Sequence, residues 1–366
     1  MTEHYTLYGA LFSLYTGKAR AYLRYKNVPY KEVFSSLKVY KRIIVPNTGV
    51  RFIPVVKTPE GQYIQDTAEI IDAIETQHPQ RPVYPPTPKQ LIVSQLFEFY
   101  GDEWLLLPAM HYRWNKDNDD YIYGHFGSVV LPGWPAFIRR FLGKKVGSKF
   151  KGFVPLLGIT EKTIPALEQW YESELLPLLD AHFAKHDYLL GSAASVGDFG
   201  LMGPLYAHLY LDPYPSQFIK AKAPNVEAWI NRMNVTPTEV GDWLADDAIP
   251  DTLLPVLQLL FRDHWPVVQD TLSAFSVWSK QNADTAIPRM IGQHPFCING
   301  AEGSRSITTF SVWKYQRILD TFNGLNEEKQ EQVNAFLNAC GADKPFNNPP
   351  FQRVKRESNK LVIDKR

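Results

Sequence analysis

The sequence has few cysteines and almost no net charge, and each of these features excludes a class of protein. Its two cysteines, Cys297 and Cys340, are too few and too far apart for a disulfide framework or a cysteine-rich zinc site. This cysteine usage fits a reduced, cytoplasmic setting. The 38 acidic and 39 basic side chains nearly cancel, so the overall charge does not predict a nucleic-acid partner.

Segments for export or membrane insertion are also missing from the sequence. The first residues, Met-Thr-Glu-His-Tyr, contain neither a basic stretch nor a long apolar stretch of the kind found in signal peptides. The longest apolar runs, such as Leu253–Leu260 with Pro255 inside, fall far short of the roughly 20 residues that a membrane span needs. We therefore expect a cytoplasmic protein without a membrane partner.

Aromatic residues and prolines are abundant. The chain of 366 residues holds 21 Phe, 19 Tyr, 9 Trp and 28 Pro. At roughly 150 residues per domain, this length predicts two to three domains. The hydrophobic share of 45% and the charged share of 21% are typical of globular proteins. The aromatics predict a large core, and the prolines predict many boundaries between elements.

Residues 1–78 alternate between strand and helix patterns. Short apolar or aromatic stretches predict strands at 5–10, 28–34, 52–56 and 63–64. Helical spacing of apolar residues predicts helices at 18–27 and from 67 onward, with a further short helix between 35 and 50. The order β-α-β-α-β-β-α predicts one small α/β domain.

A stretch with five prolines, residues 79–88, predicts a stiff linker into a helical region. Residues 89–235 predict a helical domain with an insert at 115–158, which is rich in Gly, Pro and basic residues. We expect that insert to be a mobile solvated loop, and the alternative is a surface that steers anions. Residues 236–366 predict a mainly helical extension that packs on the bundle, with an irregular tail after 345.

Pro54 interrupts the strand pattern at 52–56. A proline inside a core strand is costly unless the backbone there serves a purpose. A cis bond between Ile53 and Pro54 would leave the N–H and C=O of Ile53 free for an extended peptide ligand. The alternative is a trans proline at a strand edge or start.

Two helix starts flank this proline in the chain. Asp66-Thr67 begins the helix after the fourth strand, where spare N–H groups suit a carboxylate and Asp66 suits a ligand ammonium. Ser13 lies between the first strand and the first helix, where a hydroxyl can hold an anion or lower the pKa of a bound thiol. The alternative at both places is simple helix capping, by Thr67 and by Ser13 or Thr16.

These three features in this order, followed by the proline-rich linker and a helical domain, resemble the glutathione transferase family. The resemblance covers residues 1 to about 235, including Tyr-Gly-Ala-Leu-Phe-Ser-Leu-Tyr-Thr-Gly-Lys-Ala-Arg at 8–20. The segment Gly-Ser-Ala-Ala-Ser-Val-Gly-Asp at 191–198 looks like the family's buried capping box, formed by Ser195 and Asp198. The resemblance implies a thioredoxin-like domain followed by a helical domain, usually as a homodimer.

The resemblance also implies glutathione as co-substrate and a role for each matched residue. Ile53 and Pro54 would grip its cysteinyl backbone, and Asp66 and Thr67 would bind its γ-glutamyl end. Ser13 stands where the family has its catalytic serine or cysteine, and Tyr8 or Tyr15 are alternatives for activating the thiol. The bases Lys38 and Lys41 are candidates for the glycyl carboxylate, or they belong to a solvated surface.

The sequence departs from the family pattern at two points. Leu14 replaces the proline that commonly follows the catalytic residue, and neither position 13 nor position 16 is cysteine. Thiol–disulfide exchange needs a protein thiol, so we expect a hydroxyl-type site in which the glutathione thiolate attacks an electrophile. The resemblance places the electrophile, by analogy, beside the first long helix of the second domain. The pocket candidates, which would otherwise be core packing, are Trp104, Met110, His111, Tyr112 and Trp114.

Other functions stay open at this stage. The expected activity is a detoxifying glutathione transferase for an apolar electrophile. Alternatives are a non-catalytic binding or scaffold protein and a specialised glutathione-dependent dehalogenase, ether-cleaving enzyme or isomerase. His182 and His186 lie one helical turn apart without the nearby carboxylate of a zinc-protease motif, so we expect no metal.

Overall fold

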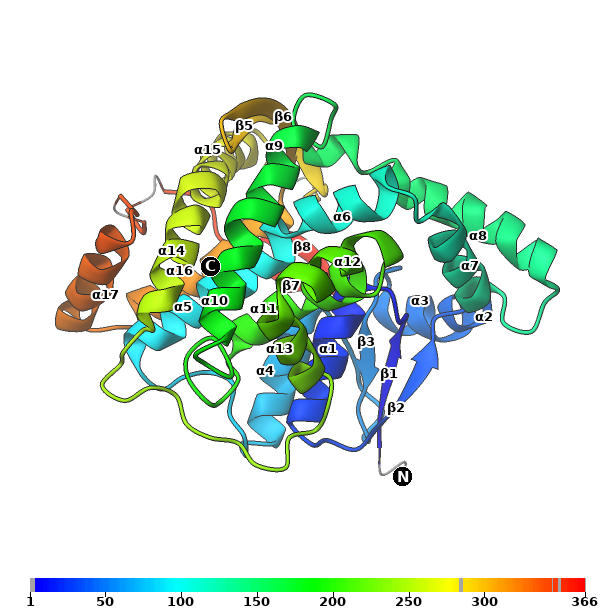
Figure 1. Ribbon diagram of the computed structural model, residues 1–366, viewed down its shortest axis with the longest axis horizontal. Helices are drawn as coiled ribbons and strands as arrows, with labels where there is room; N and C mark the ends of the chain where they lie inside the picture. Colours follow the sequence, from blue (N-terminus) through cyan, green and yellow to red (C-terminus); the bar gives the residue numbers. More distant parts are fainter. Residues whose placement is uncertain (1–3, 283–285, 344, 348–349, 366) are drawn as a thin grey trace. The chain divides into compact units, whose positions relative to one another are not determined.

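The computed structural model describes residues 4–282, 286–343, 345–347 and 350–365 (Figure 1). The chain forms two compact units, each built from three stretches of sequence. The first stretch ends at Val83, inside the predicted linker, and the predicted helical domain 89–235 contributes to both units. The first unit comprises Met1–Val83, Leu105–Val154 and Phe199–Val240, and the second comprises Tyr84–Trp104, Pro155–Asp198 and Gly241–Arg366.

The first unit contains a four-stranded mixed sheet in the order β2-β1-β3-β4. Strand β1 (Tyr5–Gly9) runs parallel to β2 (Tyr30–Phe34) and antiparallel to β3 (Val55–Lys57), which pairs antiparallel with β4 (Tyr63–Gln65). Every residue of β1 is buried, as expected for a central strand covered on both faces. The predicted order of elements in a thioredoxin-like domain is confirmed.

Helices cover both faces of this sheet. On one face α1 (Leu14–Tyr25) packs against α4 (Thr67–Gln77), as Figure 1 shows. On the other face Tyr8, Ile44 and Val55 form a small apolar cluster. The helical turns α2 (Leu37–Val39) and η1 (Tyr40–Ile44) contribute to this cluster, and α3 (Val45–Thr48) follows them in the chain.

The predicted mobile loop at 115–158 is wrong, because most of it forms two helices that pack against each other (Figure 1). They are α7 (Asp119–Val130) and α8 (Ala136–Lys151). An added Cβ at Gly143 would lie 2.0 Å from the carbonyl oxygen of Tyr123, and one at Gly127 would lie 2.1 Å from that of Arg139. The glycines that suggested a loop therefore permit two backbones to approach closely.

The rest of the first unit is helical. After α6 (Leu106–Asn115) and the α7–α8 hairpin, the chain returns to this unit at Phe199, within α11 (Val196–Pro204). The remaining elements are η5 (Leu205–Tyr210), α12 (Pro213–Lys222) and α13 (Pro224–Met233).

The second unit combines helices with two β-hairpins. The irregular tail predicted after 345 is wrong in part, because β7 (Val354–Glu357) and β8 (Lys360–Ile363) form a hairpin there. The other hairpin joins β5 (Met290–Ile298) to β6 (Ala301–Thr308) through Asn299-Gly300, whose positive φ angles suit a two-residue turn. The helices are α5 (Pro88–Phe99), η2 (Tyr100–Trp104), η3 (Pro155–Leu157), α9 (Ile164–Gln169), η4 (Trp170–Leu175), α10 (Leu176–Phe183), η6 (Asp251–Leu253), α14 (Leu254–Leu259), η7 (Leu260–His264), α15 (Trp265–Gln281), α16 (Phe310–Asn323) and α17 (Glu327–Ala339).

The C-terminal extension packs on α5 and η2, which confirms the expectation that it packs on the helical bundle. Both α16 and α17 contact α5. The buried ammonium of Lys314 lies 2.7 Å from Asp102 Oδ2, and the Ser311 hydroxyl donates to Glu103 Oε2 at 2.6 Å. Since these polar partners are buried on both sides, the extension is a structural part of the unit. None of the described helices has both the length and the apolar run that a membrane crossing requires.

The predicted capping pair at the start of α11 is confirmed. The carboxylate of Asp198 accepts hydrogen bonds from the N–H and the hydroxyl of Ser195, at 2.8 and 2.9 Å. Its other oxygen accepts from the N–H of Leu189 at 3.0 Å. Both members of the pair are fully buried. The pair therefore fixes the loop before α11 as well as the helix start.

Candidate functional site

The strand register brings the predicted site segments to one edge of the sheet. Tyr8 pairs with Val55, and Val55 pairs with Gln65, so the end of β1, the start of β3 and the end of β4 lie together. Ser13 follows β1 by four residues, Pro54 directly precedes β3, and Asp66 directly follows β4. Because β2 is parallel to β1, the segment after β2 begins at the same edge.

The bond between Ile53 and Pro54 is cis, which decides between the two alternatives that the sequence left open. Ile53 lies outside β3 and is half-buried. Among the described residues, it takes part in none of the main-chain hydrogen bonds found outside helices and strands. Its N–H and C=O are therefore open to an extended ligand at this edge.

Asp66 caps α4 in an unusual backbone conformation. Its φ angle is 88°, a region that residues other than glycine rarely adopt, and such strain concentrates at functional sites. One carboxylate oxygen accepts from the N–H of Ala68 at 2.9 Å. The half-buried carboxylate can thus cap the helix and still meet a ligand cation. Thr67 is buried at the first position of α4, where a helix has main-chain N–H groups without partners inside the helix.

Ser13 caps α1 and remains partly exposed. Its Oγ accepts from the N–H of Thr16 at 3.4 Å, which leaves its own proton to donate elsewhere. The first turn of α1 contains no acidic residue, so its positive dipole end is not offset there. The hydroxyl and the helix end together suit a thiolate.

The two tyrosine alternatives differ from Ser13 in environment. Tyr8 is buried in the apolar cluster beneath η1, stacked on Tyr63 with ring centroids 6.3 Å apart. Burial, with a smaller contribution from Tyr63, raises the pKa of Tyr8. A less acidic phenol is a weaker donor to a thiolate. Tyr15 is half-buried in the first turn of α1. The surroundings therefore favour Ser13 over Tyr8.

The basic candidates lie on the helical turns that follow β2. Lys38 is in α2 and Lys41 in η1, and both side chains are exposed. Since β2 ends at the same edge as β1, these turns begin beside the site. Either lysine can reach a ligand carboxylate only by giving up hydration, so their contribution depends on the ligand.

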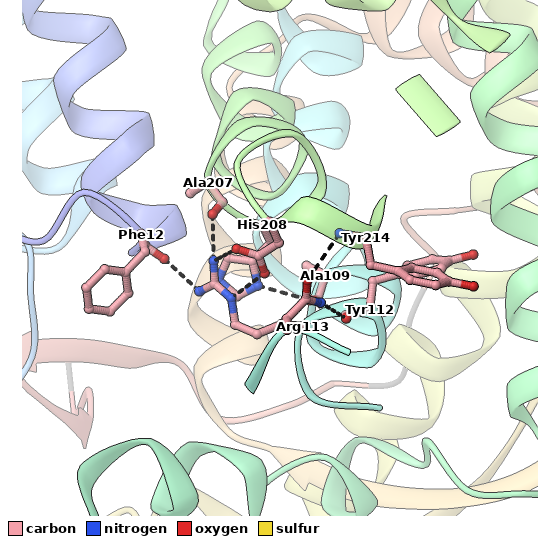
Figure 2. Close-up of polar contacts among 9 residues, drawn as sticks. Phe12, Ala109, Tyr112, Arg113, Ala207, His208 and Tyr214 are labelled. Atoms are coloured by element: carbon pink, nitrogen blue, oxygen red, sulfur yellow. Dashed lines mark hydrogen bonds and ion pairs between the residues drawn. The ribbon is translucent and has the colours of Figure 1, made fainter. Parts of the chain in front are cut away.

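A buried arginine that the sequence did not reveal fixes the loop before Ser13 (Figure 2). Arg113, in α6, donates from Nη1 to the carbonyl oxygen of Phe12 at 2.7 Å and from Nη2 to that of Ala207 at 2.6 Å. It also pairs with Asp212 through two hydrogen bonds of 2.7 and 2.8 Å. The side chains of Arg113 and Asp212 are both buried. Through the hydrogen bonds to Phe12 and Ala207, Arg113 links α6 to the loop that carries Ser13 and to η5.

His208 completes this cluster as a neutral imidazole. Its Nδ1 lies 3.0 Å from the carbonyl oxygen of Ala109, so Nδ1 carries the proton and donates it. Its Nε2, 2.7 Å from Arg113 Nη1, then accepts from the guanidinium. Burial, and next the charge of Arg113, lower the pKa of His208 well below its ordinary range, which keeps it neutral. Burial raises the pKa of Asp212, and Arg113 opposes that rise.

The α7–α8 hairpin also supports the loop before Ser13. The Phe12 ring packs against Phe126 of α7 with centroids 4.6 Å apart, and Phe126 stacks on Trp114 and Phe150. The guanidinium of Arg113 lies 5.9 Å from the centre of the Phe12 ring. The sequence contained one signal for the role of Arg113 in fixing this loop, which is the presence of an arginine within the apolar run of α6.

The five pocket candidates lie in different surroundings. Trp104 belongs to the second unit, where it contacts Trp170 and lies beneath the guanidinium of Arg305. The other four lie on α6 in the first unit. Only Met110 is half-exposed, and the buried four are Trp104, His111, Tyr112 and Trp114. Their role in a substrate pocket stays a prediction, and their burial favours core packing.

Among the residues that the structure describes, no group of three or more His, Cys, Asp or Glu side chains is arranged so that it could hold a metal ion. The rings of His182 and His186 stack with centroids 5.1 Å apart. His182 also contacts the Thr252 hydroxyl and the Tyr188 carbonyl oxygen, which occupies both ring nitrogens.

Comparison with protein families gives two matches. Residues 7–82 match the family described as "Glutathione S-transferase, N-terminal domain", and residues 157–237 match "Glutathione S-transferase, C-terminal domain". The first match contains Ser13, Pro54 and Asp66. No curated protein sequence matches the chain.

Solved structures of glutathione S-transferases match the chain at low identity. One from Methylobacterium radiotolerans, in complex with glutathione sulfonate, shares 18% identity over 66% of this chain and 100% of its own, with a TM-score of 0.38. One from Ceriporiopsis subvermispora, in complex with glutathione, shares 18% over 64% and 100%, with a TM-score of 0.41. A Tau class enzyme from mango shares 17% over 70% and 96%, with a TM-score of 0.42.

Proposed function

We propose that this chain, as a member of the glutathione S-transferase-like family, binds glutathione along the edge that carries Ser13, Ile53–Pro54 and Asp66. The observation that carries the proposal is the shared position of these segments. The register of β1, β3 and β4 brings them to one edge, and two helix N-termini begin there. Such an edge suits an extended, doubly anionic peptide with an ammonium at one end.

Each residue has a distinct role in this proposal. The N–H and C=O of Ile53 pair with the cysteinyl backbone of glutathione. The carboxylate of Asp66 pairs with the γ-glutamyl ammonium, and the N-terminus of α4 at Thr67 meets the γ-glutamyl carboxylate. Lys38 or Lys41 meets the glycyl carboxylate.

Ser13 acts on the thiol. Its hydroxyl donates a hydrogen bond to sulfur, and the positive end of α1 further favours the thiolate over the thiol. The thiol proton passes to solvent. The thiolate then attacks an electrophilic carbon, so a C–S bond forms while the bond to the leaving group breaks and takes its electron pair away. Arg113 contributes indirectly, because it holds the Phe12 carbonyl beside Ser13.

Glutathione titration with thiolate absorbance near neutral pH tests this assignment. We expect an absorbance increase on binding that Ser13→Ala abolishes and Tyr8→Phe leaves in place. Tyr8→Phe is the matched control because it removes only a hydroxyl from a buried ring. An absorbance change that survives both substitutions would reject the role of Ser13.

A second candidate function is glutathione binding without catalysis. The burial of Trp104, His111, Tyr112 and Trp114 favours it, because these side chains offer an electrophile little surface. Retention on immobilised glutathione without turnover of a chloronitrobenzene would support this candidate. Turnover that depends on Ser13 would reject it, and the conjugated or released product would then separate transferase, dehalogenase, ether-cleaving and isomerase activities.

The proposal includes a homodimer, since the family resemblance implies one. Light scattering on the purified protein at micromolar concentration measures the mass directly. A mass near twice the 41.9 kDa of one chain supports the dimer, and a mass near one chain rejects it.

A further inference from the structure

The outward side of the α7–α8 hairpin exposes large aromatic residues. Trp134 precedes α8, and Phe137 and Phe141 lie in its first two turns, with exposed fractions of 54%, 75% and 70%. Together they expose on the order of 400 Å² of aromatic surface, which is comparable with the largest apolar patch of a typical monomer. Exposed aromatics of this size mark an interaction surface.

The packing of α8 fixes this face outward. Gly143 and Gly147 lie on the side that contacts α7, where an added Cβ would come within 2.0 Å of the Tyr123 carbonyl oxygen and 2.8 Å of its ring. Phe137 and Phe141, four residues apart, share a side that is turned by about 120° from these glycines. Larger residues at the glycines would displace α7, so α8 cannot turn its aromatic face inward without losing this contact.

The same helix is strongly basic. Its sequence, Ala-Phe-Ile-Arg-Arg-Phe-Leu-Gly-Lys-Lys-Val-Gly-Ser-Lys-Phe-Lys, contains six basic residues and no acidic one. Arg140 pairs with Asp120 and Lys151 with Asp119, both in α7. Between described residues, no ion pair involves the exposed lysines of α8, which are Lys144, Lys145 and Lys149.

Aromatic and basic residues share one face of α8. Lys144 and Lys145 follow Phe141 by three and four residues, so they lie on the next turn of the same side. Phe137 and Phe141 thus occupy the N-terminal end of the face, and the lysines follow toward its C-terminal end. A basic helix with exposed Trp and Phe is the pattern of a helix that lies in the interface of a bilayer.

We propose that α8 and Trp134 dock the protein on an anionic lipid surface. Trp134, Phe137 and Phe141 enter the boundary between headgroups and acyl chains, while Lys144, Lys145 and Lys149 contact anionic headgroups. This attachment is peripheral and needs no spanning helix. The proposal differs from the sequence-based expectation of no membrane partner, and the experiment below decides between the two.

Charge argues against a second copy of the chain on this face. A two-fold contact places the same patch of both copies face to face, so the lysines of one copy would meet those of the other. Because α8 has no acidic residue, and Asp119 and Asp120 of α7 already pair with Lys151 and Arg140, these lysines would meet like charge across such a contact. An anionic bilayer instead complements both the lysines and the aromatics.

Vesicle flotation with the full chain tests the proposal. One set of vesicles is pure phosphatidylcholine, and the other contains about one third phosphatidylserine, an anionic content sufficient to attract several lysines. We expect binding to the anionic vesicles, a blue shift of tryptophan emission, and at least tenfold weaker binding at high salt. Phe137→Ser/Phe141→Ser and Lys144→Glu/Lys145→Glu should each weaken binding at least tenfold.

Two controls separate docking from unfolding and from a general charge effect. Val277→Ser, at an exposed apolar position of α15, matches the aromatic changes, and Lys185→Glu/Lys280→Glu matches the change in net charge. We expect both controls to bind as wild type and all variants to keep the wild-type unfolding midpoint. Equal binding to both vesicle types, absent binding, or equal loss in the controls would overturn the proposal. A loss of dimer mass in Phe137→Ser/Phe141→Ser without lipid binding would assign the face to a contact between copies.

Discussion

Replacing Arg113 by methionine should be among the most damaging substitutions in the first unit. Methionine keeps much of the side-chain length but removes the charge and all five N–H donors. The structure gives each donor a partner, two on Asp212 and one each on Phe12, Ala207 and His208.

The size of the loss follows from burial. Asp212 has no exposed side-chain surface, and Arg113 exposes 3% of its side chain. Removing one partner of a buried ion pair costs about 3–5 kcal/mol, and the orphaned carbonyls of Phe12 and Ala207 add to it. We therefore expect Arg113→Met to lose at least about 4 kcal/mol, a large part of the 5–15 kcal/mol that holds a typical domain folded.

Urea unfolding at neutral pH measures this loss. Arg353→Met is the matched control, because Arg353 pairs with Asp320 at 2.7 Å with both side chains nearly half exposed. An exposed pair contributes about 1 kcal/mol or less. Arg113→Met/Asp212→Leu should recover a large part of the loss by removing the orphaned carboxylate. A loss below about 1 kcal/mol for Arg113→Met would refute the reasoning, since it would show that the cluster is not buried in solution.

Arg113→Lys gives a milder variant with a functional consequence. Lysine keeps the charge but cannot make the forked contact with Asp212 and still reach the Phe12 carbonyl. Under conditions where the variant is folded, the loop before Ser13 should be less fixed, and glutathione should bind at least about tenfold more weakly, or 1.4 kcal/mol. Unchanged affinity would show that the cluster around Arg113 does not influence glutathione binding.

Three further predictions concern other parts of the chain. Burial lowers the pKa of His182 to about 4, so the unfolded state binds the proton first as pH falls. The contribution of His182 to the unfolding free energy should therefore be full above pH 6.5 and fall by about 3 kcal/mol between pH 6.5 and 4. His182→Gln should flatten the curve of unfolding free energy against pH. Gly9→Ala would place a Cβ 2.2 Å from Thr16 Cγ2 and should lower the unfolding free energy measured in urea by about 1–3 kcal/mol. Gly124→Ala in α7 has open space around the added Cβ and should raise it by about 0.5–1 kcal/mol. Truncation after Val240 removes much of the second unit, including the residues that cover α5, so circular dichroism should show a smaller cooperative transition than in the full chain. An unchanged transition would contradict the structural role of the extension.

The features that the sequence predicted correctly are short-range. The cis bond at Pro54 and the pair Ser195–Asp198 each depend on a few neighbouring residues, whereas the side chain that caps α4 is Asp66 and not the expected Thr67. The common edge of the site segments is a finding of the structure, in which strand order and register bring the ends of β1, β3 and β4 together.

The features that the sequence did not predict depend on distant partners. Glycines in 115–158 suggested a loop, yet Gly127 and Gly143 allow α7 and α8 to touch, and only the partner helix distinguishes the two cases. Arg113 and Asp212 are 99 positions apart, so no local pattern pairs them. The aromatic residues of α6 suggested a pocket because sequence alone does not separate a buried aromatic from one that lines a cleft.

The central claim is that the edge carrying Ser13, Ile53–Pro54 and Asp66 binds glutathione. Isothermal titration of glutathione into wild type and Asp66→Asn tests it most directly. Asparagine caps a helix and tolerates a positive φ as well as aspartate does, so this change removes the charge alone. We expect saturable binding to wild type and at least about tenfold weaker binding to Asp66→Asn, with unchanged unfolding free energy. Equal affinity for both proteins, or no binding to wild type, would contradict it.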